Sequence, residues 1–141
     1  MVEILDESVQ RQKPLKAPRA LRIVVAEDDR DSMLMLAMIL RDEGHEVRCV
    51  YNGGEALDVL RGFDADVVLL DIALPTLSGW EVARRIRERH GHTRPIVIGI
   101  SGEYKAGADK ILSDIIGFDY YLLKPYDPQV LVKLIAPLPG R

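Results

Sequence analysis

The chain of 141 residues has one cysteine, 6% aromatic residues and no long apolar stretch, so it has few features that could cross-link it or anchor it in a membrane. A single cysteine, Cys49, excludes an internal disulfide and is typical of a reducing compartment. It lies in an alternating apolar run and is predicted to be a small core residue. No stretch approaches the roughly 18 apolar residues that a membrane span requires, and the N-terminus lacks a signal-peptide pattern. We therefore expect a cytoplasmic protein without a membrane partner.

An excess of positive charge is also lacking. The formal net charge is −3, with 29% charged and 48% hydrophobic residues, a composition that is ordinary for a globular protein. Direct nucleic-acid binding needs a basic surface, so we expect no nucleic-acid partner. The length predicts a single domain with a core large enough to fold unaided.

Residues 1–19 differ from the rest of the chain. Acidic residues come first and basic residues follow, and Pro14 and Pro18 block a continuous helix. We interpret this segment as a flexible arm or linker. The alternative is that its few apolar residues dock on a partner or on a second copy. Residues 139–141 are interpreted as a tail.

Between residues 20 and 138, short apolar runs alternate with segments of helical spacing. Strands are predicted at 21–25, 46–50, 67–70, 95–100 and 120–123. A helix is predicted after each strand; the fourth, at 107–116, has the weakest pattern. The fifth begins with Asp127 as N-cap and Pro128 in its first turn. Such short connections force right-handed crossovers, which predicts an α/β fold with a doubly wound parallel five-stranded sheet.

Several side chains away from the strand ends are predicted to lie at the surface. Trp80 is expected to cover the loop before the third helix, and the arginines of that helix to form a solvated face with glutamates four residues away. The surface set is Arg84, Arg85, Arg87, Arg89, His45, His90 and His92.

Polar side chains follow the carboxyl ends of four predicted strands: Glu27 and Asp28, then Asp71, Ser101 and Lys124. Parallel strands end at one edge of the sheet, where such folds bind ligands, so these side chains are expected in one crevice. Three clustered carboxylates repel one another. Mg²⁺ prefers oxygen ligands and would relieve that repulsion, while an ammonium and a hydroxyl suit phosphoryl oxygens. The set predicts a site for phosphoryl transfer.

The motifs around these residues resemble the receiver domain of two-component response regulators, which has the CheY-like, flavodoxin-like fold with strand order 2-1-3-4-5. The resemblance covers residues 20–138. It is carried by IVVAEDD at 23–29, VLLDIALP at 68–75 with Ser78-Gly79 after it, ISG at 100–102 and LKPY at 123–126.

That resemblance implies a role for each residue of the crevice. Asp71 would accept a phosphoryl group from a histidine kinase or a histidine phosphotransfer protein. Asp28 and Asp71 would bind Mg²⁺ directly and Glu27 through water. The remaining implied ligands are the backbone carbonyl of Ala73 for the metal, and Ser101 and Lys124 for the phosphoryl oxygens.

The resemblance also implies a conformational switch made by Ser101 and Tyr121. Ser101 would move toward the phosphoryl group and Tyr121 would turn into the vacated space, although Tyr121 could also be an ordinary strand aromatic. The face formed by 107–116, 120–123 and the last helix would then change and engage a downstream protein. Its residues include Ile111, Ile115 and Gln129. We expect a monomer or a phosphorylation-dependent dimer, and no enzymatic activity beyond Mg²⁺-dependent self-phosphorylation and self-dephosphorylation.

The chain departs from the family pattern at a few positions. Glu27, Ser101 and Gly102 replace the commoner aspartate, threonine and alanine, and the segment 102–107 matches poorly. The segment 117–125 resembles receivers of hybrid kinases more than those of transcription factors. The chain is either a stand-alone receiver or a piece of a larger kinase or regulator.

Three alternatives use the same type of fold or site. A phosphatase of the haloacid-dehalogenase type would need Asp-x-Asp, where this chain has Asp71-Ile72-Ala73. A flavin-binding module would need a phosphate loop rich in serine, threonine and glycine, where this chain has Glu27-Asp28-Asp29. A degenerate receiver would act only through protein contacts, which the complete site argues against.

Overall fold

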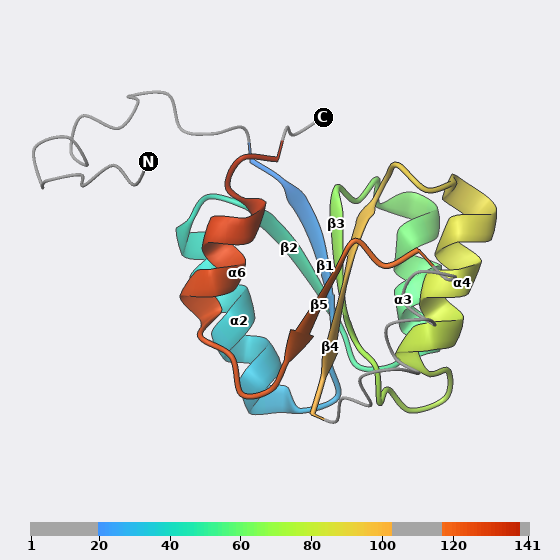
Figure 1. The fold of residues 1–141 in the computed structure, drawn as a ribbon, viewed down its shortest axis with the longest axis horizontal. Helices are drawn as coiled ribbons and strands as arrows, with labels where there is room; N and C mark the ends of the chain where they lie inside the picture. Colours follow the sequence, from blue (N-terminus) through green and yellow to red (C-terminus); the bar gives the residue numbers. More distant parts are fainter. Residues whose placement is uncertain (1–19, 103–116, 139–141) are drawn as a thin grey trace, which may run out of the picture.

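Five parallel strands form one sheet in the order β2-β1-β3-β4-β5 (Figure 1). The computed structural model describes residues 20–102 and 117–138. The strands are β1 (Arg22–Ala26), β2 (Glu46–Val50), β3 (Val67–Asp71), β4 (Ile96–Ser101) and β5 (Tyr120–Leu123). The predicted fold class and strand order are confirmed.

Helices cover both faces of this sheet (Figure 1). On one face lie α2 (Arg30–Asp42) and α6 (Pro128–Ile135), and on the other lie α3 (Gly53–Gly62) and α4 (Gly79–His90). The helix predicted at 107–116, the arm at 1–19 and the tail at 139–141 lie outside the described residues. No helix within the two described ranges is long and apolar enough to cross a membrane.

Strand β3 is at the centre of the sheet, and all five of its residues are buried. Burial on both faces explains the continuous apolar run over 67–70. Successive side chains of a strand point to opposite faces, so the sheet separates two cores. The core beneath α2 and α6 includes Val25, Leu36, Leu69 and Ile135. The core beneath α3 and α4 includes Val24, Ala56, Leu70 and Val82.

Each described helix begins with a capping side chain directly after a strand or a short loop. The side chains accept hydrogen bonds from backbone N–H groups of the first turn, which otherwise have no partner in the helix. The caps are Asp29 for α2, Asn52 for α3, Ser78 for α4 and Asp127 for α6. The predicted start of the last helix at Asp127 and Pro128 is confirmed.

Gly79 allows α4 to begin against the end of β3. Its N–H donates to the carbonyl oxygen of Ile72 at 2.9 Å. A Cβ at this position would lie 2.6 Å from the carbonyl oxygen of Asp71, closer than real Cβ atoms approach a backbone oxygen. The first residue of α4 is therefore in contact with the main chain that carries Asp71.

Arg87 is buried, so its predicted place on a solvated face is wrong. Its guanidinium donates to the carbonyl oxygens of Gly117 (2.8 Å) and Pro95 (2.9 Å) and forms an ion pair with Asp119 (2.6 Å). The planar fork of an arginine can satisfy several acceptors at once, which makes its burial tolerable. It ties the end of α4 to the starts of β4 and β5.

Two other predictions also need correction. His45, predicted at the surface, is buried, and its Nδ1 accepts a hydrogen bond from the N–H of Leu21 at 3.1 Å. Burial lowers the pKa of His45 and raises the pKa of the Cys49 thiol. Cys49, predicted in the core, is half-buried and packs against the core beneath α2 and α6.

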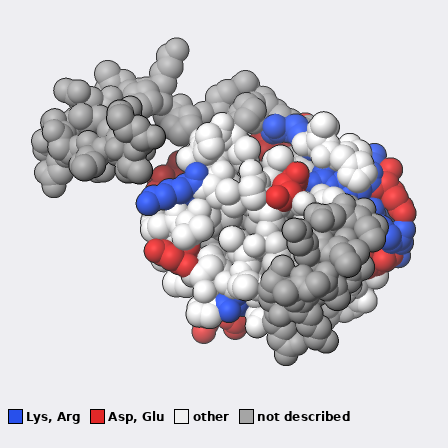
Figure 2. Space-filling model, viewed as in Figure 1, with Lys and Arg blue, Asp and Glu red and all other residues white. Residues whose placement is uncertain are grey.

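The other charged residues of α4 are solvated, as predicted. Arg84 pairs with Glu81 and Glu88, and Arg85 also pairs with Glu81. Figure 2 shows both signs of charge intermixed at the edge where α4 lies, with uncharged residues across the centre of this face.

Two arginines of α4 therefore differ in their expected contribution to stability. Arg87→Met is expected to lower the free energy of unfolding by about 3–5 kcal/mol, because it leaves buried acceptors without a donor. Arg84→Met removes only exposed ion pairs and is expected to change the free energy of unfolding little. Urea unfolding followed by circular dichroism measures both values. Equal losses would contradict the role assigned to Arg87.

Candidate functional site

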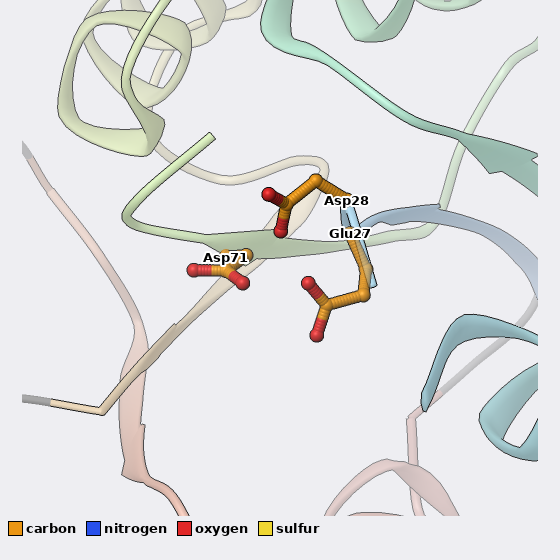
Figure 3. A group of neighbouring side chains, drawn as sticks. All are labelled: Glu27, Asp28 and Asp71. Carbon is orange, nitrogen blue, oxygen red and sulfur yellow. The ribbon is translucent and has the colours of Figure 1, made fainter. Parts of the chain in front are cut away.

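Three carboxylates meet at the carboxyl edge of the sheet. Glu27 and Asp28 follow β1, and Asp71 is the last residue of the neighbouring strand β3. One oxygen of each lies within 4.8 Å of the others. Figure 3 shows the three side chains around one space beside the ends of the two strands. The structure thus brings together the three acidic residues that the sequence places at strand ends.

The cluster has a buried side and a side open to water. Glu27 is 7% exposed and Asp71 is 6% exposed, whereas Asp28 is an exposed residue. Ser101, at the end of β4, is also buried, with 7% exposure. A charge at Asp71 is therefore screened less by solvent than a charge at Asp28.

Lys124 neutralises part of the cluster. Its Nζ donates to Oε1 of Glu27 at 2.8 Å and to Oδ2 of Asp71 at 3.0 Å. Its backbone N–H donates to the carbonyl oxygen of Ser101 at 2.7 Å, which holds the end of β5 against β4. The ammonium of Lys124, which follows β5, therefore links Glu27, which follows β1, to Asp71, the last residue of β3.

Backbone donors occupy the remaining oxygens of the buried carboxylates. The N–H of Ala73 donates to Oδ1 of Asp71 at 2.9 Å, and the N–H of Asp29 donates to Oε2 of Glu27 at 3.3 Å. Both carboxylates are therefore held in one orientation. The carbonyl of Ala73, the implied metal ligand, belongs to the same residue whose N–H fixes Asp71.

The two buried carboxylates differ in their affinity for a proton. Burial and the hydrogen bond with Asp71 raise the pKa of Glu27 to about 7. Burial also acts to raise the pKa of Asp71, but hydrogen bonds from Glu27, the Ala73 N–H and Lys124 outweigh it and hold that pKa below its usual value. Lys124 loses solvation, yet its two acidic partners keep its pKa above the usual range. Asp71 is thus the anion and Lys124 the cation of the site.

A cavity of about 460 Å³ opens beside these charged groups. Glu27, Asp71 and Lys124 line one side of it, and the rest of its wall is mainly apolar. Met35 of α2 and Tyr126 contribute to that wall, and burial raises the pKa of Tyr126. Neither residue was predicted to lie at the site. Met35 could have been suspected from the sequence, because it is an apolar residue outside the apolar face of its helix. In the structure, 51% of its surface is exposed.

The proposed switch residues lie on neighbouring strands. Tyr121 of β5 is half-buried and pairs in register with Gly99 of β4, two residues before Ser101. Trp80, which was predicted to cover a loop, stacks on the ring of Tyr121, with 6.0 Å between centroids. The sequence carries no local signal for this contact, because 41 positions (121 − 80) separate the two rings.

Comparison with known proteins assigns the family. The sequence model of the family described as response regulator receiver domain matches residues 23–136. The chain belongs to this family. A CheY-like receiver domain protein from Methanospirillum hungatei is 28% identical, with 82% of this chain and 90% of that chain covered and a TM-score of 0.75.

Two further solved structures resemble this receiver domain. The receiver domain of the sensor histidine kinase PA1611 from Pseudomonas aeruginosa is 26% identical, with 82% of this chain and 94% of that chain covered and a TM-score of 0.73. It is described with a magnesium ion coordinated in its active site cleft. The chemotaxis response regulator CheY4 of Vibrio cholerae is 23% identical, with 82% and 96% covered and a TM-score of 0.75, and it supports the fold alone.

The donor set of this receiver domain suits Mg²⁺. Receiver domains bind Mg²⁺ in their active site and interact with histidine kinases or phosphotransfer proteins. Here three carboxylates offer hard oxygen ligands within 4.8 Å of one another, and one of them faces water. Mg²⁺ typically takes one or two carboxylates and keeps several waters. Lys124 alone leaves part of the negative charge of the cluster uncompensated.

The raised pKa of Glu27 predicts a pH dependence of stability in the absence of Mg²⁺. A carboxyl with a higher pKa in the folded state contributes its full stabilisation below its ordinary value of 4.5, and loses it as the pH rises through about 7. Relative to Glu27→Gln, we expect the free energy of unfolding of the unmodified domain to fall by about 1–2 kcal/mol between pH 5 and pH 8, after solvent screening is allowed for. Urea unfolding of both proteins in EDTA at several pH values measures this difference in the free energy of unfolding.

The comparison with Glu27→Gln is needed because His45 titrates with the opposite sign. Burial lowers the pKa of His45, so its contribution to stability is lost as the pH falls. That contribution is common to both proteins and cancels in the difference. Glu88→Gln, at an exposed glutamate, serves as the matched control. The same pH profile in Glu27→Gln and in the unmodified domain would contradict the prediction.

Proposed function

We propose that this receiver domain is a phosphoacceptor of a two-component phosphorelay, in which Asp71 takes a phosphoryl group from a phosphohistidine. The donor is a histidine kinase or a histidine phosphotransfer protein. The observation that carries the proposal is the position of Asp71, an anionic carboxylate between the ammonium of Lys124 and two further carboxylates. A structural aspartate would need the lysine but not the additional acids.

The residues around Asp71 suit an in-line transfer. A carboxylate oxygen of Asp71 forms the new O–P bond while the P–N bond of the donor breaks, and the electron pair of that bond leaves with the imidazole nitrogen. Lys124, already 3.0 Å from Asp71, and the hydroxyl of Ser101 would bind phosphoryl oxygens. Mg²⁺, held by Asp28, Asp71 and the Ala73 carbonyl and through water by Glu27, would supply the positive charge that phosphoryl oxygens require.

Phosphorylation of Asp71 would shift a conformational equilibrium. The added charge and acceptor oxygens favour the state in which Ser101 approaches the phosphoryl group and Tyr121 turns toward the space it leaves. The affected face contains β5 and α6, where Leu123 is 46% exposed, Val130 is 50% exposed and Gln129 is also exposed. Ile111 and Ile115, predicted on this face, lie outside the described residues. A downstream protein would read the change.

The domain would act on itself and not on outside substrates. We propose Mg²⁺-dependent self-phosphorylation and self-dephosphorylation only, in the cytoplasm. The phosphatase alternative has little support, because Ala73 offers a methyl group where the second aspartate would be needed. The flavin alternative also has little support, since Glu27 and Asp28 place negative charge where a flavin phosphate would bind.

Asp71→Asn is expected to abolish phosphorylation. Incubation with a radiolabelled phosphohistidine donor and Mg²⁺ should label the unmodified domain, and the variant should incorporate less than about 1% of that label, because an amide is a far weaker nucleophile than a carboxylate. Chelation of Mg²⁺ with EDTA should reduce labelling of the unmodified domain to a similar extent. Phosphate incorporation by peptide mapping is the readout.

The matched control is Asp58→Asn, at an exposed aspartate that pairs with Arg61 away from the cluster. It should be labelled like the unmodified domain. Asp71→Asn should remain folded, because it removes one of three clustered negative charges and its buried amide keeps hydrogen-bonding groups. Label at position 71 of the variant, or labelling indifferent to EDTA, would refute the proposal.

A further inference from the structure

Three aromatic rings from three segments meet beside β4. Trp80, the second residue of α4, stacks on Tyr121 of β5 with centroids 6.0 Å apart and planes at 27°. Phe118 meets both rings edge to face, with centroids 5.2 Å from Trp80 and 6.2 Å from Tyr121. Stacked and edge-to-face pairs favour an arrangement beyond the area that they bury. Each ring therefore restricts the positions open to the other two.

Gly99 leaves room for one of these rings, that of Phe118. It pairs in register with Tyr121, and a Cβ at Gly99 would lie 2.9 Å from the ring of Phe118. Phe118 thus packs directly on the main chain of β4. Side chains two residues apart in a strand point to the same face, so Ser101 belongs to the face of β4 on which the rings lie.

The first turn of α4 connects the ring cluster to Asp71. Gly79 lies so close to the carbonyl oxygen of Asp71 that a Cβ would not fit. Its N–H donates a hydrogen bond to the carbonyl oxygen of Ile72. Trp80 is the next residue. A displacement of the main chain after Asp71 is therefore passed to Trp80, because no gap separates the start of the helix from the end of the strand.

We propose that Trp80 is a positioning residue of the switch, and that its ring holds Tyr121 in the orientation of the unphosphorylated domain. This inference rests on the proposed function, because it requires Tyr121 to be the residue that turns. Asp71 would then be connected to Tyr121 in two ways: through the movement of Ser101 that the proposed function includes, and through the contacts of Gly79 with Asp71 and of Trp80 with Tyr121. The second connection opposes activation until the chain after Asp71 moves.

The test compares the affinity of the domain for beryllofluoride, a mimic of the phosphoryl group, in the presence of Mg²⁺. If the stack favours the unphosphorylated orientation, Trp80→Leu should bind beryllofluoride about two- to tenfold more tightly than the unmodified domain, the range that one aromatic pair contributes to an equilibrium. Trp80→Phe keeps a ring and should lie between the two. Amide chemical shifts during the titration give the dissociation constants.

A double-mutant cycle separates positioning from a general structural effect. In a Tyr121→Leu background, Trp80→Leu should leave the dissociation constant unchanged within about twofold, because the ring that Trp80 positions is absent. Equal affinity of Trp80→Leu and the unmodified domain would overturn the inference. So would weaker binding, or the same gain in both backgrounds. If the unmodified domain itself binds no beryllofluoride, the proposed function is refuted, and this inference with it.

A second measurement needs no change at position 80. Trp80 is the only tryptophan of the chain, so its fluorescence reports this site alone. Beryllofluoride with Mg²⁺ should change its emission in the unmodified domain and change it less in Tyr121→Leu, where only the connection through Gly79 remains, with Mg²⁺ alone as the reference. Unchanged emission in the unmodified domain, or the same change in both proteins, would overturn the inference even if Trp80→Leu did not fold.

Discussion

The site depends on one ammonium group between two buried carboxylates. Lys124 Nζ lies 2.8 Å from Glu27 and 3.0 Å from Asp71, and each of these three residues follows or ends a different strand. Without this cation, the ends of β1 and β3 would bring like charges together in a poorly solvated place. The lysine offsets one charge, and burial raises the pKa of Glu27 to about 7, which reduces the negative charge of that carboxyl near neutral pH. What remains is an anionic Asp71 beside a solvated Asp28, an arrangement that favours a divalent cation and an incoming phosphoryl group.

Features determined by neighbours along the chain could be predicted from the sequence. The boundaries of β5 and the start of α6 at Asp127 agree with the structure, because a β-branched or aromatic run and an N-cap act locally. The site was predictable for a different reason. Parallel strands all end at one edge, so identifying the strands was enough to bring Glu27, Asp28 and Asp71 together.

Contacts between distant segments could not be predicted in this way. The charge of an arginine such as Arg87 assigns it to solvent, although it lies four residues after the buried Ala83. Its burial depends on acceptors at Gly117 and Asp119, which come 30 and 32 residues later. His45 is buried because the N–H of Leu21 needs an acceptor at the start of β1. The stack of Trp80 on Tyr121 likewise depends on the placement of α4 against β5. In each case the partner is supplied by the fold and not by the neighbouring sequence.

Asp71 combines two kinds of contact that respond to different changes. Its side chain faces the charges of the site, so a phosphoryl group there alters electrostatics directly. Its carbonyl oxygen faces the first residue of α4 with no room for a Cβ, so a shift of its main chain alters packing. A carboxylate on a long surface side chain would respond only to the first. Because packed elements resist continuous deformation, the second contact is suited to convert a local change of charge into a displacement of a helix.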